Sequence, residues 1–343
     1  MSERALHSSG SGEELLFLDF ADVWTPVTYS GQLRAERPMK VTVAGTALVL
    51  FRDERGAPAA LIDRCPHRGV ALSLGRIQRG CLQCPFHGWT FNRDGDCVRV
   101  PWNPDAKRTG LGATPVPARE LGGHVWVHTS VGVQPPDEPT LHASLTARDI
   151  RLTGIEMIWN THWTRVMENM LDWPHLPFVH RATIGKGLVD LVDEAMDTVI
   201  EDHPWGWRVR NVLHGLNRPG MLDFRWPNQM NLHIPLKKRS LTLAVTCVPV
   251  DSHRTRLLLI AARDFARWPP LDYFFNRTNR RIANEDRAIT ESSFPAEVPP
   301  ARAEKSVRTD APTLRFRKAY FARLKGSGAA AAVSSSSRAS RLP

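Results

Sequence analysis

Two short loops of the chain each pair a cysteine with a histidine, and no other feature constrains the fold as strongly. The loops read CPHRG from Cys65 and CPFHGW from Cys84. As ligand patterns they are Cys65-x-His67, sixteen intervening residues, and Cys84-x2-His87, with proline and glycine as turn residues between strand-like segments. Two thiolates and two imidazoles predict a mixed-ligand [2Fe–2S] cluster, whose potential lies at roughly −150 to +300 mV.

Zinc is the alternative occupant of a site with two cysteines and two histidines. Zinc fingers place both histidines on one helix, whereas here each loop supplies one residue of each type, which favours the iron–sulfur cluster. The remaining cysteines, Cys81, Cys97 and Cys247, are interpreted as structural residues. Five cysteines is a sparse and odd number, which argues against a disulfide scaffold and predicts a reducing compartment, the cytoplasm.

A second group of candidate ligands lies in the segment ENMLDWPHLPFVH. Asn169, Asp172 and His175 are spaced three apart and share one face if the segment is helical, while His180 follows five residues later. A helix is predicted over residues 163–178, and its prolines would distort it so that both imidazoles point at one ion. Two histidines with one carboxylate form the facial triad of non-haem Fe(II) sites. Asn169 is either a residue beside that site or an ordinary helix residue.

The carboxylate of such a triad need not be near in sequence. Asp286 is the best candidate, because a helix predicted over residues 271–291 would turn it inward. Glu285 would point about 100° away and is the second choice. Asp264 and Asp272 are weaker candidates, because they precede the regular part of that helix.

Over residues from about Phe17 to Phe321 the chain resembles the Rieske non-haem iron oxygenases of the α-subunit type. Within that family it is more similar to the single-chain branch of vanillate O-demethylase, dicamba monooxygenase and pheophorbide a oxygenase. The resemblance implies an α+β protein, with an all-β Rieske domain followed by a helix-grip-like catalytic domain that contains an antiparallel sheet. We expect a disordered N-terminus over 1–12, the Rieske domain over 13–135, the catalytic domain over 136–325 and a disordered tail over 326–343.

The same resemblance assigns roles to the two groups of residues. The cluster ligands would be Cys65, His67, Cys84 and His87, and the iron ligands would be His175, His180 and Asp286. Asp172 would bridge the two centres by contacting an iron-ligating histidine and the cluster ligand His87, across a subunit boundary in a head-to-tail homotrimer. Oxygen would be the co-substrate. Electrons would come from NAD(P)H through a separate ferredoxin or flavin reductase, since no GxGxxG opens a helix in this chain.

Composition narrows the classes of partner. The net charge is +10, but residues 299–343 hold ten Lys/Arg against two acidic residues and so carry +8 of it. The nearly neutral remainder argues against a nucleic-acid-binding domain. No apolar run approaches the ~20 residues of a membrane span. The function predicted is hydroxylation or oxidative demethylation of an aromatic or polycyclic small molecule. The alternative is a Rieske electron-transfer or ligand-binding protein with an inactive iron site.

Overall fold

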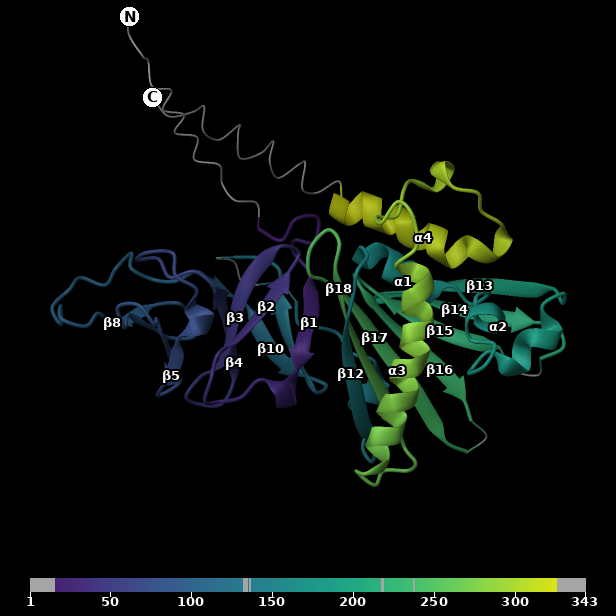
Figure 1. The fold of residues 1–343 in the computed structure, drawn as a ribbon, viewed down its shortest axis with the longest axis horizontal. Coiled ribbons are helices and arrows are strands. Elements are labelled where there is room, and N and C mark those ends of the chain that lie inside the picture. The colour runs from purple at the N-terminus through teal and green to yellow at the C-terminus, as the bar shows by residue number, and fades with distance from the viewer. Residues whose placement is uncertain (1–15, 132–134, 136, 217–218, 237, 326–343) are drawn as a thin grey trace, which may run out of the picture.

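A computed structural model describes residues 16–131, 135, 137–216, 219–236 and 238–325. The segments 1–12 and 326–343, for which disorder is expected, lie outside these residues. Within the described part, the chain forms an all-β lobe followed by a lobe in which helices cover one face of an antiparallel sheet (Figure 1). The α+β class is therefore confirmed. No helix of the described residues combines the length and the apolar character needed to cross a membrane.

The first lobe consists of short antiparallel strands, as its alternating and glycine-interrupted sequence predicts. Three small sheets have the orders β1-β11-β10, β2-β3-β4-β9 and β5-β6-β7-β8 within the described residues. Their strands are β1 (Trp24–Tyr29), β2 (Met39–Val43), β3 (Thr46–Arg52), β4 (Pro58–Ile62), β5 (Arg76–Gln78), β6 (Cys81–Gln83), β7 (Thr90–Phe91), β8 (Cys97–Arg99), β9 (Pro115–Val116), β10 (Ala118–Leu121) and β11 (His124–His128).

The second lobe is built on a seven-stranded antiparallel sheet with the order β12-β18-β17-β16-β15-β14-β13. Its strands are β12 (Arg151–Trp159), β13 (Met196–His203), β14 (Gly206–Leu213), β15 (Gly220–Arg225), β16 (Gln229–Pro235), β17 (Ser240–Pro249) and β18 (Thr255–Arg263). The helices are α1 (Trp163–Leu171), α2 (Leu176–Val179), α3 (Leu271–Thr290) and α4 (Ala311–Tyr320). Figure 1 shows α3 running across the sheet, with α4 beyond its end.

Alternation along the strands separates the two faces of this sheet. Leu222 and Phe224 of β15 point towards the helices, whereas Asp223 and Arg225 point to the opposite face, and all four are buried. The helix-facing residues join the main core, which also includes buried residues of β1 and β11 in the first lobe. One face of the sheet is thus aliphatic and the other carries the charged side chains.

The two lobes share contacts as well as a core. Phe20 packs edge-on against Trp163 of α1 with ring centroids 5.3 Å apart. The Tyr29 hydroxyl lies 2.6 Å from the Ile155 carbonyl oxygen and 3.0 Å from that of Leu259. These contacts hold β1 and the segment before it against the second lobe.

The helix predicted over residues 163–178 is wrong in its length. α1 ends at Leu171, and Asp172 already has an extended backbone, although its N–H still donates to the Glu168 carbonyl. Pro174 explains the break, because a proline cannot donate to the helix and disfavours a helical conformation in the residue before it. A short second helix, α2, follows at Leu176. Asn169 and Asp172 therefore do not share a continuous helix with His175.

Two candidate metal centres

The two cysteine–histidine loops adopt the same turn. In the first, the Cys65 N–H donates to the Val70 carbonyl at 2.8 Å, and the Gly69 N–H returns to the Cys65 carbonyl at 2.8 Å. In the second, Cys84 donates to the Trp89 carbonyl at 2.8 Å, and Gly88 returns to Cys84 at 3.2 Å. Both glycines have φ of +71°, the left-handed region that favours glycine. The shared Cys-Pro-x-x-Gly pattern thus specifies two equivalent loops.

These loops bring the four predicted cluster residues to one place with unequal exposure. The thiols of Cys65 and Cys84 are buried, whereas His87 is exposed. The rings of His67 and His87 lie with centroids 4.6 Å apart, and His67 stacks on Trp89 at 4.5 Å. The cysteines therefore lie inside the lobe and the histidine edge faces outward.

The donor atoms fit an iron–sulfur cluster. The buried Nδ1 of His67 has no hydrogen-bond partner. Burial, together with hydrogen bonding to the Cys84 thiol, raises the pKa of Cys65 to about 11. Such a thiol becomes a thiolate only beside a strong cation, and a buried imidazole nitrogen without a partner is available as a ligand. Sequence and geometry thus agree on the type of site.

The second centre lies where α3 passes the end of α2. The Asp286 Oδ1 lies 3.0 Å from His180 Nε2 and 3.3 Å from His175 Nε2. Asp286 and His180 are buried, and the side chain of His175 is 15% exposed. Asp286 shares its helix face with the buried Ala283, which is why this acid of α3 points inward.

An ion at the centre of these three atoms explains an otherwise costly arrangement. The buried Oδ1 of Asp286 has no hydrogen-bond partner despite its short distances to both imidazoles. Donors held at ~2.1 Å from one ion and about 90° apart are about 3.0 Å from each other, close to the spacing observed. The residues therefore fit the facial arrangement of a first-row metal ion with open positions.

Electrostatics within this group of residues agree with cation binding. Burial alone would lower the pKa of His175, but the carboxylates of Asp172 and Asp286 outweigh it and raise the pKa to about 9. Burial alone would raise the pKa of Asp286, but the two histidines lower it to about 2. The carboxylates therefore favour positive charge at the two imidazoles, where a bound ion would take the place of the protons.

Glu285 contacts the other ring nitrogen of His180. Its Oε2 lies 2.8 Å from His180 Nδ1 and accepts a hydrogen bond from the Thr183 hydroxyl at 2.7 Å. A carboxylate at Nδ1 holds the proton there and leaves Nε2 free to face an ion. The sequence indicates Glu285 only as an alternative iron ligand. The phase of the helix alone does not predict its contact with His180 Nδ1. Thr183 has no signal in the sequence.

The weaker acidic candidates lie elsewhere. Asp272 pairs with Arg151 and Arg263 at the start of α3, and Asp264 belongs to neither group of donors. Asp172 does approach the site, with its Oδ2 3.3 Å from His175 Nδ1 and its side chain 31% exposed. Asn169 lines the cavity at the same place, so both residues of the motif lie near the histidines in spite of the helix break.

A cavity opens between these residues and the sheet, with about 630 Å³ of space free of protein atoms, part of it open to solvent. Its helix side carries the polar residues of the site. Its sheet side is formed by aliphatic and thioether side chains: Leu222, Met230, Leu232, Leu243, Val245, Leu257 and Leu259. A metal ion at the three donors would therefore face the apolar side of this cavity.

A further cluster of polar residues lies on the other face of the sheet. Asp223 is fully buried, pairs with Arg208 at 2.6 Å, and lies 3.0 Å from His233 and 3.5 Å from His142. The sequence predicts no site here. Because the guanidinium already neutralises the carboxylate, this cluster is an internal ion-pair network rather than a second ion site.

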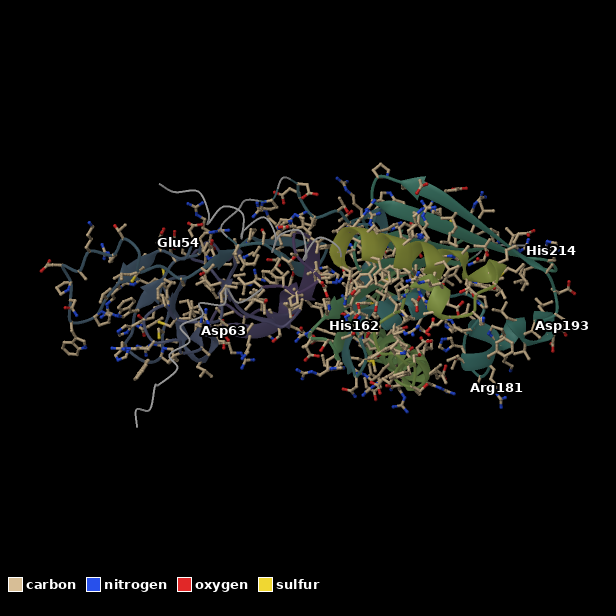
Figure 2. All side chains as sticks on the ribbon, turned by 90° about the horizontal axis from the view of Figure 1, so that it is seen from above. Glu54, Asp63, His162, Arg181, Asp193 and His214 are labelled. Carbon is tan, nitrogen blue, oxygen red and sulfur yellow. The ribbon has the colours of Figure 1, made fainter. Side chains whose placement is uncertain are left out.

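The two candidate centres lie far apart within one chain. Asp63, two residues before Cys65, lies in the first lobe, whereas Arg181, which follows His180, lies near the far end of the second lobe (Figure 2). Figure 1 shows the same separation between β5 and α2. The chain thus carries its two groups of ligands at different ends of the molecule.

Comparison with known proteins agrees with this division. The Rieske [2Fe-2S] domain model matches residues 23–113, and the vanillate O-demethylase oxygenase C-terminal domain model matches residues 159–234 and 217–325. Methylxanthine N3-demethylase NdmB of Pseudomonas putida is 30% identical over 308 residues, which are 82% of this chain and 81% of that protein. Its solved structure, from strain CBB5, has a TM-score of 0.75 at 28% identity and covers 87% of this chain and 89% of that one.

The chloroplastic chlorophyllide a oxygenase of Chlamydomonas reinhardtii is 29% identical over 307 residues, which are 83% of this chain but 45% of that protein. The chain spans about half the length of the chlorophyllide a oxygenases it matches. A cluster-type domain, a catalytic sheet and the similarity to NdmB over most of both chains lead to one conclusion. The chain belongs to the Rieske non-haem iron oxygenases.

Proposed function

We propose that this chain is an oxygenase component that hydroxylates or oxidatively demethylates an aromatic or polycyclic small molecule. The observation that carries the proposal is the convergence of His175 Nε2, His180 Nε2 and Asp286 Oδ1 on an apolar cavity, in a chain that also has the two cysteine–histidine loops. A Rieske cluster and a mononuclear Fe(II), when bound, would supply single electrons and the activation of O2. For a methyl ether the reaction is R–OCH3 + O2 + 2e⁻ + 2H⁺ → R–OH + CH2O + H2O.

The residues of the chain would perform distinct parts of this reaction. Cys65, Cys84, His67 and His87 would hold the cluster, with the exposed His87 facing an electron donor. His175, His180 and Asp286 would hold the iron. The aliphatic wall of the sheet would position the substrate carbon and exclude water, so that protons reach the site from the helix side, where Asp172 is partly exposed.

Electron transfer between the centres would occur between subunits. The two groups of ligands lie in different lobes, while Asp172 is in contact with His175 and partly open to the surface. These features support a head-to-tail homotrimer, in which Asp172 bridges to His87 of a neighbouring subunit. The electrons would come from NAD(P)H through a separate ferredoxin or flavin reductase. All five cysteines are unpaired, which supports a reducing compartment such as the cytoplasm.

The test is metal content and spectroscopy on the wild type and on His175→Ala. We expect about three iron and two acid-labile sulfide per chain, a Rieske-type EPR signal after reduction, and loss of one iron in the variant. Two iron per chain, unchanged by the variant even after incubation with ferrous iron, would instead identify an electron carrier or ligand-binding protein. Light scattering would test the trimer, and oxygen uptake dependent on added aromatic compounds would test catalysis.

A further inference from the structure

The described lining of the cavity contains acidic side chains but no basic ones other than histidine. Among the described residues that line it there is no lysine and no arginine, and the only charged groups besides the histidines are the carboxylates of Asp172 and Asp286. With a divalent ion bound, the two carboxylates balance its charge. The described lining therefore offers no surplus positive charge to a second anion.

Three arginines of the described residues that lie close to the site in sequence or on the sheet point away from the cavity. Arg181, although adjacent to His180, is exposed at the edge of the molecule (Figure 2). Arg281 of α3 is 65% exposed and lies 3.4 Å from Glu285. On the sheet, Arg208 lies on the face opposite to the cavity, where it pairs with Asp223. Strand alternation thus places the charged side chains on one face and leaves an aliphatic wall on the other.

We infer that the cavity takes an uncharged, largely apolar ring compound and discriminates against carboxylates of the same size. The inference deepens the proposed function and rests on it for the identity of the site. A carboxylate moved from water to this wall loses its hydration and gains no cationic partner, whereas an uncharged ring loses little and is favoured by apolar contact. Asn169 is the one uncharged amide in the lining, and it can contact a carbonyl or ring nitrogen of such a compound.

A matched pair of probes tests the inference on the iron-loaded protein. 4-Methoxytoluene and 4-methoxybenzoate have the same ring and methyl ether and differ in a methyl group against a carboxylate. We expect isothermal titration calorimetry to give at least tenfold tighter binding of 4-methoxytoluene. Equal binding, tighter binding of 4-methoxybenzoate, or no detectable binding of either probe would overturn the inference. Tighter binding of the carboxylate only when iron is present would overturn it too, since the ion would then be the partner of the anion.

Two variants with an added charge test whether the aliphatic wall of the sheet causes the preference for the uncharged probe. Leu243→Lys places an ammonium group in the cavity, and Val212→Lys adds the same charge to β14 at an exposed position on the opposite face. We expect the preference for the neutral probe to fall at least tenfold in Leu243→Lys and to stay unchanged in Val212→Lys. An unchanged preference in a folded Leu243→Lys would contradict the inference. If circular dichroism shows that this variant does not fold, the wild-type ratio decides alone.

Failure of the inference and failure of the proposed function give different results. Single-turnover reactions of the reduced protein with O2 report formaldehyde from either probe. Preferential binding of the neutral probe, without formaldehyde and without oxygen uptake on any aromatic compound, would uphold the specificity and contradict the oxygenase. Formaldehyde from 4-methoxybenzoate at a rate equal to or above that from 4-methoxytoluene would uphold the oxygenase and overturn the inferred specificity.

Discussion

At the scale of single residues, the contacts behind the proposed ligands are as informative as the ligands themselves. His180 has two ring nitrogens, and the structure gives them different neighbours, Glu285 at Nδ1 and Asp286 at Nε2. The sequence indicates both acids but ranks them only by helix phase. To tell which acid is the ligand and which orients His180, one needs the position of His180 relative to α3. That position depends on the end of the helix at Leu171.

Glu285→Gln should weaken iron binding without destroying the site. The amide keeps the size of the side chain but no longer holds a proton on His180 Nδ1 through a charged hydrogen bond, so we expect roughly 10- to 100-fold lower iron affinity. Iron retained against a competing chelator is the measurement. Asn284→Ala, at the exposed neighbouring position of α3, is the control and should keep wild-type affinity. Equal iron retention in Glu285→Gln would contradict the orienting role.

His124 predicts a pH dependence of stability that is independent of metal. Burial lowers the pKa of His124 from 6.5 to about 4. As the pH falls below 6.5 the unfolded chain takes up a proton that the folded chain does not, so the folded state loses about 2 kcal/mol between pH 7 and pH 5. His124→Gln should lose less stability over this interval. The melting temperature at both pH values is the measurement, and the exposed His214→Gln should behave like wild type.

At the scale of elements, the sequence defines the loops better than the helices. The Cys-Pro-x-x-Gly pattern supplies the turn residues of both loops, so the two turns could be predicted from the sequence. The length of α1 could not, because hydrophobic spacing continues past Leu171 and only Pro174 interrupts it. The phase of α3 was predictable, since Ala283 and Asp286 lie on one face among polar neighbours.

Gly88→Ala should destabilise the second loop. A left-handed backbone costs a non-glycine residue about 1–2 kcal/mol, and the new Cβ would also lie 3.0 Å from the Pro101 ring. We expect a lower melting temperature and less cluster per chain, measured by visible absorbance and sulfide content. Gly31→Ala, which meets no atom within 4 Å and has no left-handed backbone, is the control. A Gly88→Ala protein with the stability and cluster content of Gly31→Ala would refute the argument.

At the scale of the whole molecule, the two lobes are joined more closely than their sequences suggest. The sequence predicts two domains that meet near residue 135, but a single core extends from β1 and β11 to the catalytic sheet. The order of the seven strands could not be predicted from the sequence either. β12 pairs with β18 across about a hundred residues, and no local pattern indicates such pairing. Alternation indicates which residues of a strand share a face, but not which face lines a cavity.

Phe20→Ala should therefore lower the stability of both lobes together. The ring is fully buried against Trp163, and its removal leaves a cavity that costs about 3–5 kcal/mol. We expect one calorimetric transition in the wild type and one transition at lower temperature in the variant, with cluster absorbance and helix signal lost together. Phe294→Ala, at a ring that is 92% exposed, should change little. Two transitions, of which only one shifts, would show that the lobes unfold independently.

The ligands and the apolar lining of the cavity come from different elements, and this separation affects how such a protein can acquire new substrates. The candidate ligands come from the two residues that flank α2 and from α3, whereas the apolar wall comes from β15 to β18. Substitutions in the wall can therefore change the shape offered to a new compound while the ion-binding geometry stays intact. Gene duplicates of this chain could acquire new specificities through a few strand positions, each reached through intermediates that still bind iron.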